Sequence, residues 1–211
     1  MSYAFSIAML GKEHEARSNV RGGAKWNIVR RFAHGILSLG IIYYWLPDPL
    51  FIEGAHRWYA LLGAVLIAST IEFARLKRKK IFPGMRSYEE SRIASYVYAV
   101  IGVAVVLSIS PDVVGIPCII GMAFCDPFAG ELRHRGVPEI RIVILAGIAY
   151  ALLALCSLIL IGVNSITIAL LVAVMTPLAI LSEQIDLKYL DDDLTMLIFP
   201  AIAGTFLLMI V

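Results

Sequence analysis

The stretches IVILAGIAYALLALCSLILIG (residues 142–162) and SITIALLVAVMTPLAILS (residues 165–182) decide the fold class, because neither contains a charged residue. Each is close to the roughly 20 apolar residues that a helix needs to cross a bilayer. The bilayer interior offers no water to backbone amides, so each stretch is expected to be an α-helix. The whole chain agrees, since 60% of its residues are hydrophobic against about 45–50% in soluble domains. An integral membrane protein is therefore predicted.

The rest of the chain divides into five further apolar segments, which predicts an all-α bundle of about seven transmembrane helices, with six to eight as the range. Ser110-Pro111-Asp112 forms a plausible tight turn between two of them, and Pro127 and Gly130 are expected to disfavour helix continuation. The predicted organisation is an N-terminal segment, residues 1–31, followed by one membrane domain, residues 32–211. The five segments are residues 32–46, 57–74, 92–110, 112–128 and 195–211.

The basic residues mark one side of this bundle. Of the 18 lysines and arginines, only Arg57 falls in a connection on the opposite side. The positive-inside rule assigns the basic side to the cytoplasm, so residues 1–31 are expected to be cytoplasmic and the C-terminus external. Most acidic residues fall in or beside the same connections, so an active site is expected at the cytoplasmic face. A prokaryotic plasma membrane is the expected location for so short a chain.

Carboxylates stand at the cytoplasmic ends of two predicted helices. Asp126 lies in CDPFAGE (residues 125–131), and three consecutive aspartates, residues 191–193, precede the last apolar segment. Such groups are good cation ligands, since Mg²⁺ is usually held by one or two carboxylates together with nucleotide phosphates. The alternatives are a solvated helix terminus for Asp126 and ordinary N-caps for the aspartates, although one cap is enough to start a helix.

Two further groups combine charged residues with apolar segments. Glu72 and Arg75 share a helix face, which fits either a site with Arg75 near a phosphate or an ion pair at the membrane edge. Arg31 and His34 open the first segment, where basic residues also act as topology signals and headgroup contacts. The sequence contains no P-loop, GxGxxG, HExxH or GxSxG motif, so the soluble nucleotide-binding and hydrolase folds that carry them are not indicated.

Taken in order, these groups resemble the dolichol kinase and phytol kinase family of CTP-dependent membrane lipid kinases. Residues 182–204 resemble the family's Glu followed by Asp-Asn-Leu-Thr-Ile-Pro, with Asp193 in place of Asn and Leu197 in place of Pro. Residues 125–136 resemble its Gly-Asp-Pro/Ala segment, with Cys125 in place of Gly. Weaker likenesses are residues 94–102, which include Tyr98, the pair Arg31 and His34, and the pair Glu72 and Arg75.

The resemblance implies transfer of the γ-phosphoryl group of CTP to a long-chain lipid alcohol of the polyprenol or dolichol, phytol or geranylgeraniol type, with Mg²⁺ as cofactor. The implied partners are CTP, the lipid alcohol and membrane lipids, with no nucleic acid. Asp126 and Asp192 are the implied metal ligands, which requires Asp126 and the aspartates after Leu190 to meet in one pocket. The implied catalytic residues are Asp126, Asp192, Glu72 and Glu183; the nucleotide-binding residues are Arg75, Arg133, Arg135, Asp193 and Thr195; the substrate-side residues are Arg31, His34 and Tyr98.

Two other functions are compatible with the same pattern. A lipid-phosphate cytidylyltransferase uses the same nucleotide, metal and membrane setting. A transporter whose carboxylates carry protons belongs to a different class, but transport sites tend to lie near the bilayer midplane. The position of these carboxylates at helix ends favours the enzyme.

Overall fold

The computed structural model describes residues 24–50, 54–82, 84–85, 87–184 and 190–210. Every regular element in these ranges is a helix, and no β-strand is formed there, which confirms the predicted all-α class. The elements are α2 (Ala24–Leu37), the 3₁₀ helix η1 (Ser38–Trp45), α3 (Trp58–Lys77), the 3₁₀ helix η2 (Ser87–Glu90), α4 (Ser95–Ile109), α5 (Asp112–His134), α6 (Glu139–Ile161), α7 (Ser165–Gln184) and α8 (Asp192–Ile210).

Five of these helices, α3, α5, α6, α7 and α8, are long and apolar enough to cross a membrane. The prediction of several membrane-spanning helices is therefore confirmed, and the number in the described part of the chain is five rather than about seven. Helix α4 is apolar but has only 15 residues. The first predicted segment is divided between α2 and η1. Because α2 begins at Ala24, the boundary drawn after Arg31 falls inside a helix; residues 1–23 of the predicted N-terminal segment lie outside the described residues.

Helix α5 occupies the centre of the bundle. It contacts α2, η1, α4, α6, α7 and α8, and its small residues let neighbouring side chains approach closely, as is common between membrane helices. The expectation that Pro127 and Gly130 would interrupt it is wrong, because the helix continues to His134. A proline inside a membrane helix is tolerated where surrounding helices satisfy the freed backbone groups, and α5 has such neighbours on most of its sides.

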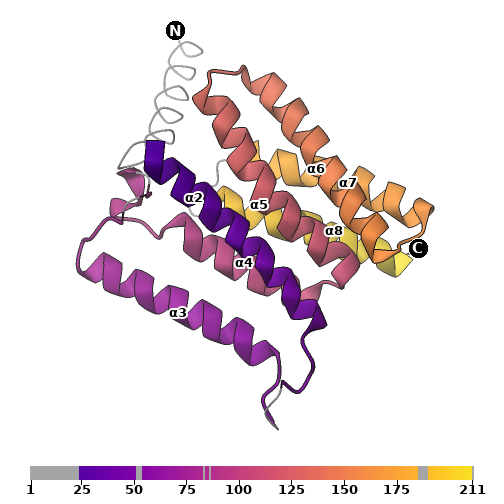
Figure 1. Ribbon diagram of the computed structural model, residues 1–211, viewed down its shortest axis with the longest axis horizontal. Helices are drawn as coiled ribbons and strands as arrows, with labels where there is room; N and C mark the ends of the chain where they lie inside the picture. The colour runs from indigo at the N-terminus through magenta and orange to yellow at the C-terminus, as the bar shows by residue number, and fades with distance from the viewer. Residues whose placement is uncertain (1–23, 51–53, 83, 86, 185–189, 211) are drawn as a thin grey trace.

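Helix α3 lies at the edge of the bundle, beside α4 (Figure 1). Only Ala68, Glu72 and Arg75 of its 20 residues are buried. The large apolar side chains along the rest of the helix are exposed, which is the pattern expected for a helix that faces lipid. The exposed set includes Trp58, Leu62, Leu66, Ile67, Ile71 and Phe73.

The buried charged and histidine side chains of the described residues gather at one end of the bundle. The chain reverses direction between consecutive long helices, so the end of α3, the start of α4, the end of α5 and the start of α8 meet there, toward the upper left of Figure 1. The start of α2 lies at the same end. This end therefore holds the candidate site. The buried set is His34, Glu72, Arg75, Glu89, Asp126, Glu183 and Asp193.

Candidate functional site

Three buried side chains from three helices converge at this end: His34 from α2, Asp126 from α5 and Asp193 from α8. Each has a ligand atom within 4.8 Å of those of the other two, and His34 Nε2 lies 3.7 Å from Asp126 Oδ2. We call these three residues the HDD cluster. The prediction that Asp126 meets the aspartates after Leu190 is confirmed by this geometry.

Asp193 is the most demanding member of the HDD cluster. It is 1% exposed, and neither carboxylate oxygen has a hydrogen-bond partner among the described residues. A buried carboxylate without hydrogen bonds is costly unless a cation or a proton compensates it. Asp126, also buried, lies beside it, which raises the cost further. A donor set of two carboxylates and one imidazole fits a divalent cation, with room in its coordination for phosphate oxygens.

The first turn of α8 explains why the three consecutive aspartates have different environments. Asp191 precedes the helix, and its Oδ1 accepts a hydrogen bond of 3.2 Å from the Asp193 backbone N–H, as an N-cap residue does. Its Oδ2 lies 3.0 Å from Ser95 Oγ. Asp193 points into the bundle, and Asp192 is half-buried beside both neighbours. The N-cap interpretation and the ligand interpretation therefore hold for different aspartates.

The metal pair predicted from the sequence was Asp126 with Asp192. The structure instead groups Asp126 with His34 and Asp193, whereas Asp192 belongs to a second group with Asp191 and Asp193. Asp193 was predicted as a nucleotide contact and His34 as a substrate-side residue. The rotation of α8 about its axis decides which aspartate faces inward, and three consecutive identical residues carry no signal of that rotation.

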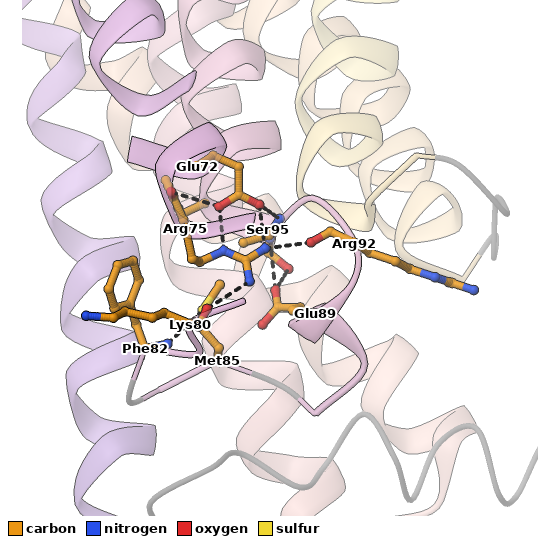
Figure 2. Close-up of polar contacts among 10 residues, drawn as sticks. Glu72, Arg75, Lys80, Phe82, Met85, Glu89, Arg92 and Ser95 are labelled. Carbon is orange, nitrogen blue, oxygen red and sulfur yellow. Dashed lines mark hydrogen bonds and ion pairs between the residues drawn. The ribbon is translucent and has the colours of Figure 1, made fainter. Parts of the chain in front are cut away.

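Glu72 and Arg75 form a separate network, shown in Figure 2. Arg75 Nε and Nη2 donate to the two carboxylate oxygens of Glu72, both at 2.7 Å, and Nη2 lies 2.7 Å from the carbonyl oxygen of Arg92. Glu72 also accepts hydrogen bonds from the Ala94 backbone N–H at 2.8 Å and from Tyr96 Oη at 3.0 Å. These contacts fit the ion-pair alternative. They fasten the end of α3 to the connection before α4, and both charged groups are occupied in doing so.

A pocket of about 180 Å³ opens beside the HDD cluster, between α2 and α4. Its polar side includes Arg30, His34 and Ser95, together with Glu89, which the sequence analysis did not single out. Glu89 is 3% exposed, and its Oε1 lies 2.9 Å from both the backbone nitrogen and the hydroxyl of Ser95. Glu89 lies in a short 3₁₀ helix within a polar connection, where an acidic residue gives no sign of burial.

The remaining predicted residues lie around this centre. Arg31 and Arg135 both pair with Glu131, and Arg133 Nη2 lies 2.7 Å from Glu183 Oε1 and 2.8 Å from Glu139 Oε1. Thr195 is buried, with its hydroxyl near the carbonyl oxygens of Ser182 and Asp192. Tyr98 is half-buried on α4 and does not line the pocket.

The arrangement combines a cation-binding geometry with a nearby pocket and a basic bundle end. Comparisons with protein-family models, with curated proteins and with solved structures found no match. The chemistry that the residues themselves support is the binding of a divalent cation and an anionic ligand at the HDD cluster. A second, mostly apolar ligand fits beside them in the pocket.

Proposed function

We propose that this protein is a CTP-dependent lipid kinase, which phosphorylates the hydroxyl of a long-chain alcohol of the polyprenol or dolichol, phytol or geranylgeraniol type. One observation carries the proposal: Asp126 and Asp193 are buried side by side with His34, and both oxygens of Asp193 lack hydrogen-bond partners among the described residues. Such a site favours a divalent cation, and phosphoryl transfer depends mainly on positioning and charge neutralisation.

The proposed roles follow from position. Asp126 and Asp193 hold the cation, with His34 beside them, and a Mg²⁺ bound there supplies charge neutralisation for the triphosphate. Arg30 lines the adjoining pocket, where a cationic side chain can attract the phosphates. The Glu72–Arg75 network positions the connection between α3 and α4. The choice of CTP rests on the likeness of residues 125–136 and 182–204 to the dolichol kinase family.

The cytoplasmic placement of the reaction rests on charge. The end of the bundle with the HDD cluster also receives the basic connections around residues 75–92 and 133–141, and the positive-inside rule places such connections in the cytoplasm. CTP is supplied in water and the lipid alcohol in the membrane. A site at the helix ends allows both to reach it.

The direct test is transfer from γ-labelled CTP, with ATP in parallel, to a panel of alcohols that contains dolichol, phytol, geranylgeraniol and diacylglycerol. We expect a labelled lipid phosphate and CDP from the purified protein in Mg²⁺. Asp126→Asn and Asp193→Asn should each lower the rate by about 100-fold or more, the scale of losing one electrostatic contact to the reacting group. Asp112→Asn, at the opposite end of α5, is the control and should leave the rate unchanged.

The products also separate the other functions. Release of pyrophosphate with a CMP-bearing lipid would identify a cytidylyltransferase. Full transfer by both Asp126→Asn and Asp193→Asn would exclude the HDD cluster as the metal site. Proton flux into proteoliposomes without nucleotide turnover would favour a transporter.

A further inference from the structure

The pocket between α2 and α4 has one polar wall and one apolar wall. The polar wall holds Arg30, His34, Glu89 and Ser95, all at the bundle end that carries the HDD cluster. The apolar wall consists of small and aliphatic side chains that lead away from that end. These are Ala33, Leu37, Met85, Ala94, Ala99 and Val100.

The pocket touches the HDD cluster at two points. His34 belongs to both, with its Nε2 directed to Asp126 Oδ2 at 3.7 Å. Ser95 lines the pocket, and its hydroxyl lies 3.0 Å from Asp191, next to Asp193 in the chain. A group held at the polar wall therefore adjoins the proposed phosphoryl-transfer centre. This juxtaposition is independent of the sequence motifs.

The size of the pocket restricts what it holds. At about 180 Å³ it is smaller than the roughly 300–1,000 Å³ of pockets that enclose a small molecule. It suits the head and first carbons of a longer chain whose remainder lies in lipid. The exposed side chains of Phe32 and Ile36 on α2, next in sequence to Ala33 and Leu37, provide an apolar surface along which such a chain can continue.

Glu89 defines the head group that this wall recognises. Its Oε1 lies within 2.9 Å of the Ser95 hydroxyl, and a carboxylate has capacity for further donors. The same serine hydroxyl lies near Asp191, and one hydroxyl hydrogen can serve only one of two acceptors at a time. The wall is therefore rich in acceptors and suits a hydrogen-bond donor such as an alcohol. A carboxylate or phosphate head group would meet the repulsion of Glu89.

We infer that this pocket binds the hydroxyl end of a single-chain, long-chain alcohol, with Glu89 and Ser95 facing the hydroxyl and the chain leaving between α2 and α4. The identity of this alcohol as a phosphoryl acceptor rests on the proposed function, whereas its binding does not. A diacylglycerol, with two chains and two ester groups, fits the small pocket poorly. The inference thus narrows the acceptor class to single-chain alcohols.

Binding can be measured without turnover, with a hexadecanol photoprobe that carries a diazirine near the hydroxyl and a terminal alkyne. The purified protein in dodecyl maltoside is irradiated with the probe without nucleotide, and the labelled residues are located by mass spectrometry. We expect saturable labelling on α2 and α4 around Ala33, Leu37 and Val100. Excess hexadecanol should compete about tenfold better than 1-methoxyhexadecane, because the ether cannot donate the hydrogen bond to a charged acceptor.

Two variants and a matched control sharpen the test. Ala33→Phe fills the pocket from an exposed position and should lower saturable labelling about tenfold, a loss typical of steric exclusion from an apolar site. Ala64→Phe makes the same change at an exposed position on α3 and should have no effect. Glu89→Gln should narrow the preference for hexadecanol over the ether, because a neutral acceptor forms a weaker hydrogen bond.

The outcomes separate this inference from the proposed kinase activity. Labelling that stays unchanged in Ala33→Phe, or that maps to other helices, overturns the pocket assignment even if the protein phosphorylates alcohols. Saturable labelling in the pocket, lost in Ala33→Phe, supports the assignment even if no transfer from CTP is found, and in that case only the kinase proposal fails. Equal competition by hexadecanol and its ether removes the role given to Glu89.

Discussion

The carboxylates of Asp126 and Asp193, from α5 and α8, lie within 4.8 Å of each other in the interior of the bundle. Both residues are more than nine-tenths buried, and His34 is the nearby basic group that the cluster contains. Two carboxylates at this separation repel each other strongly in a low-dielectric interior. The protein therefore carries an electrostatic cost at this point, which a bound cation would relieve.

A bound cation should consequently stabilise the fold. At a Mg²⁺ or Mn²⁺ concentration about 100-fold above Kd, linkage predicts a stabilisation of roughly 2.7 kcal/mol, which corresponds to several degrees in Tm. Thermal unfolding in detergent, with EDTA and with the metal, measures this shift.

Asp193→Asn should remove most of the metal-dependent shift while raising or preserving Tm in EDTA, because it deletes one of two repelling charges. Asp112→Asn, at the opposite end of α5, should keep the full shift. The same metal response in the wild type and in Asp193→Asn would contradict the proposed ligand role. A lower Tm for Asp193→Asn in EDTA would show that the carboxylate has a protein partner instead.

The Arg75 network should be a major source of stability at the same end of the bundle. Arg75 is 1% exposed and contacts both oxygens of Glu72 as well as a backbone carbonyl oxygen. Breaking a buried pair by removing one partner costs about 3–5 kcal/mol, and lysine cannot reproduce the planar fork of donors. Arg75→Lys and Arg75→Met should therefore both shift the SDS unfolding midpoint strongly downward.

Arg135→Lys is the matched control for Arg75→Lys. Arg135 also pairs with a glutamate, but its side chain is 70% exposed, and such pairs contribute about 0–1 kcal/mol. Its unfolding midpoint should change little. If Arg75→Lys were as mild as Arg135→Lys, the network would not be the strut that fixes the connection between α3 and α4.

The sequence predicts the fold class well, because hydropathy reports directly on the cost of burying backbone and charge in lipid. The apolar segments near residues 142–162, 165–182 and 195–211 coincide with α6, α7 and α8 to within a few residues. The continuation of α5 through Pro127 could not be predicted in this way, since it depends on the neighbours that surround α5. The length of α4 is likewise set by its polar connections.

The site was predictable in outline and not in detail. Charge patterning placed Asp126 and the aspartates before α8 at one end, and the structure brings Asp126 and Asp193 together. The choice among Asp191, Asp192 and Asp193 depends on the rotation of α8. Glu89 escaped notice because a glutamate in a polar connection is ordinarily solvated, and only the packing of α2 against α4 shows that it is buried.

Arg133 should prove important for stability as well as for any contact with phosphate. It pairs with Glu183, whose side chain is 1% exposed, and with Glu139, whose side chain is 40% exposed. Arg133→Met leaves the buried Glu183 carboxylate without this partner and should cost about 3–5 kcal/mol. Glu139→Gln should cost about 0–1 kcal/mol, as for other exposed pairs.

The double variant Arg133→Met with Glu183→Met distinguishes pairing from simple loss of packing. Replacing both buried partners with apolar groups is often close to neutral, so the double variant should recover most of the stability lost in Arg133→Met. An additive loss, measured as the SDS unfolding midpoint, would show that the two side chains do not act as a pair.

The packing of α5 against α6 depends on the absence of a side chain at Gly121. A Cβ atom there would lie 2.2 Å from Tyr150 Cε2 and 2.6 Å from Cδ2, and the Tyr150 ring is fully buried, so the ring has little room to move. Overpacking of this kind costs about 1–3 kcal/mol. Gly121→Ala should therefore lower the unfolding midpoint clearly.

Gly130→Ala provides the control for Gly121→Ala within the same helix. No atom lies within 4 Å of a Cβ at Gly130, so the alanine should be neutral or should stabilise α5 by about 0.5–1 kcal/mol through its better helix propensity. Adding Tyr150→Leu to Gly121→Ala should recover part of the lost stability, because the smaller side chain relieves the clash. Equal effects of the two glycine substitutions would mean that helix propensity, and not the contact with Tyr150, governs this part of α5.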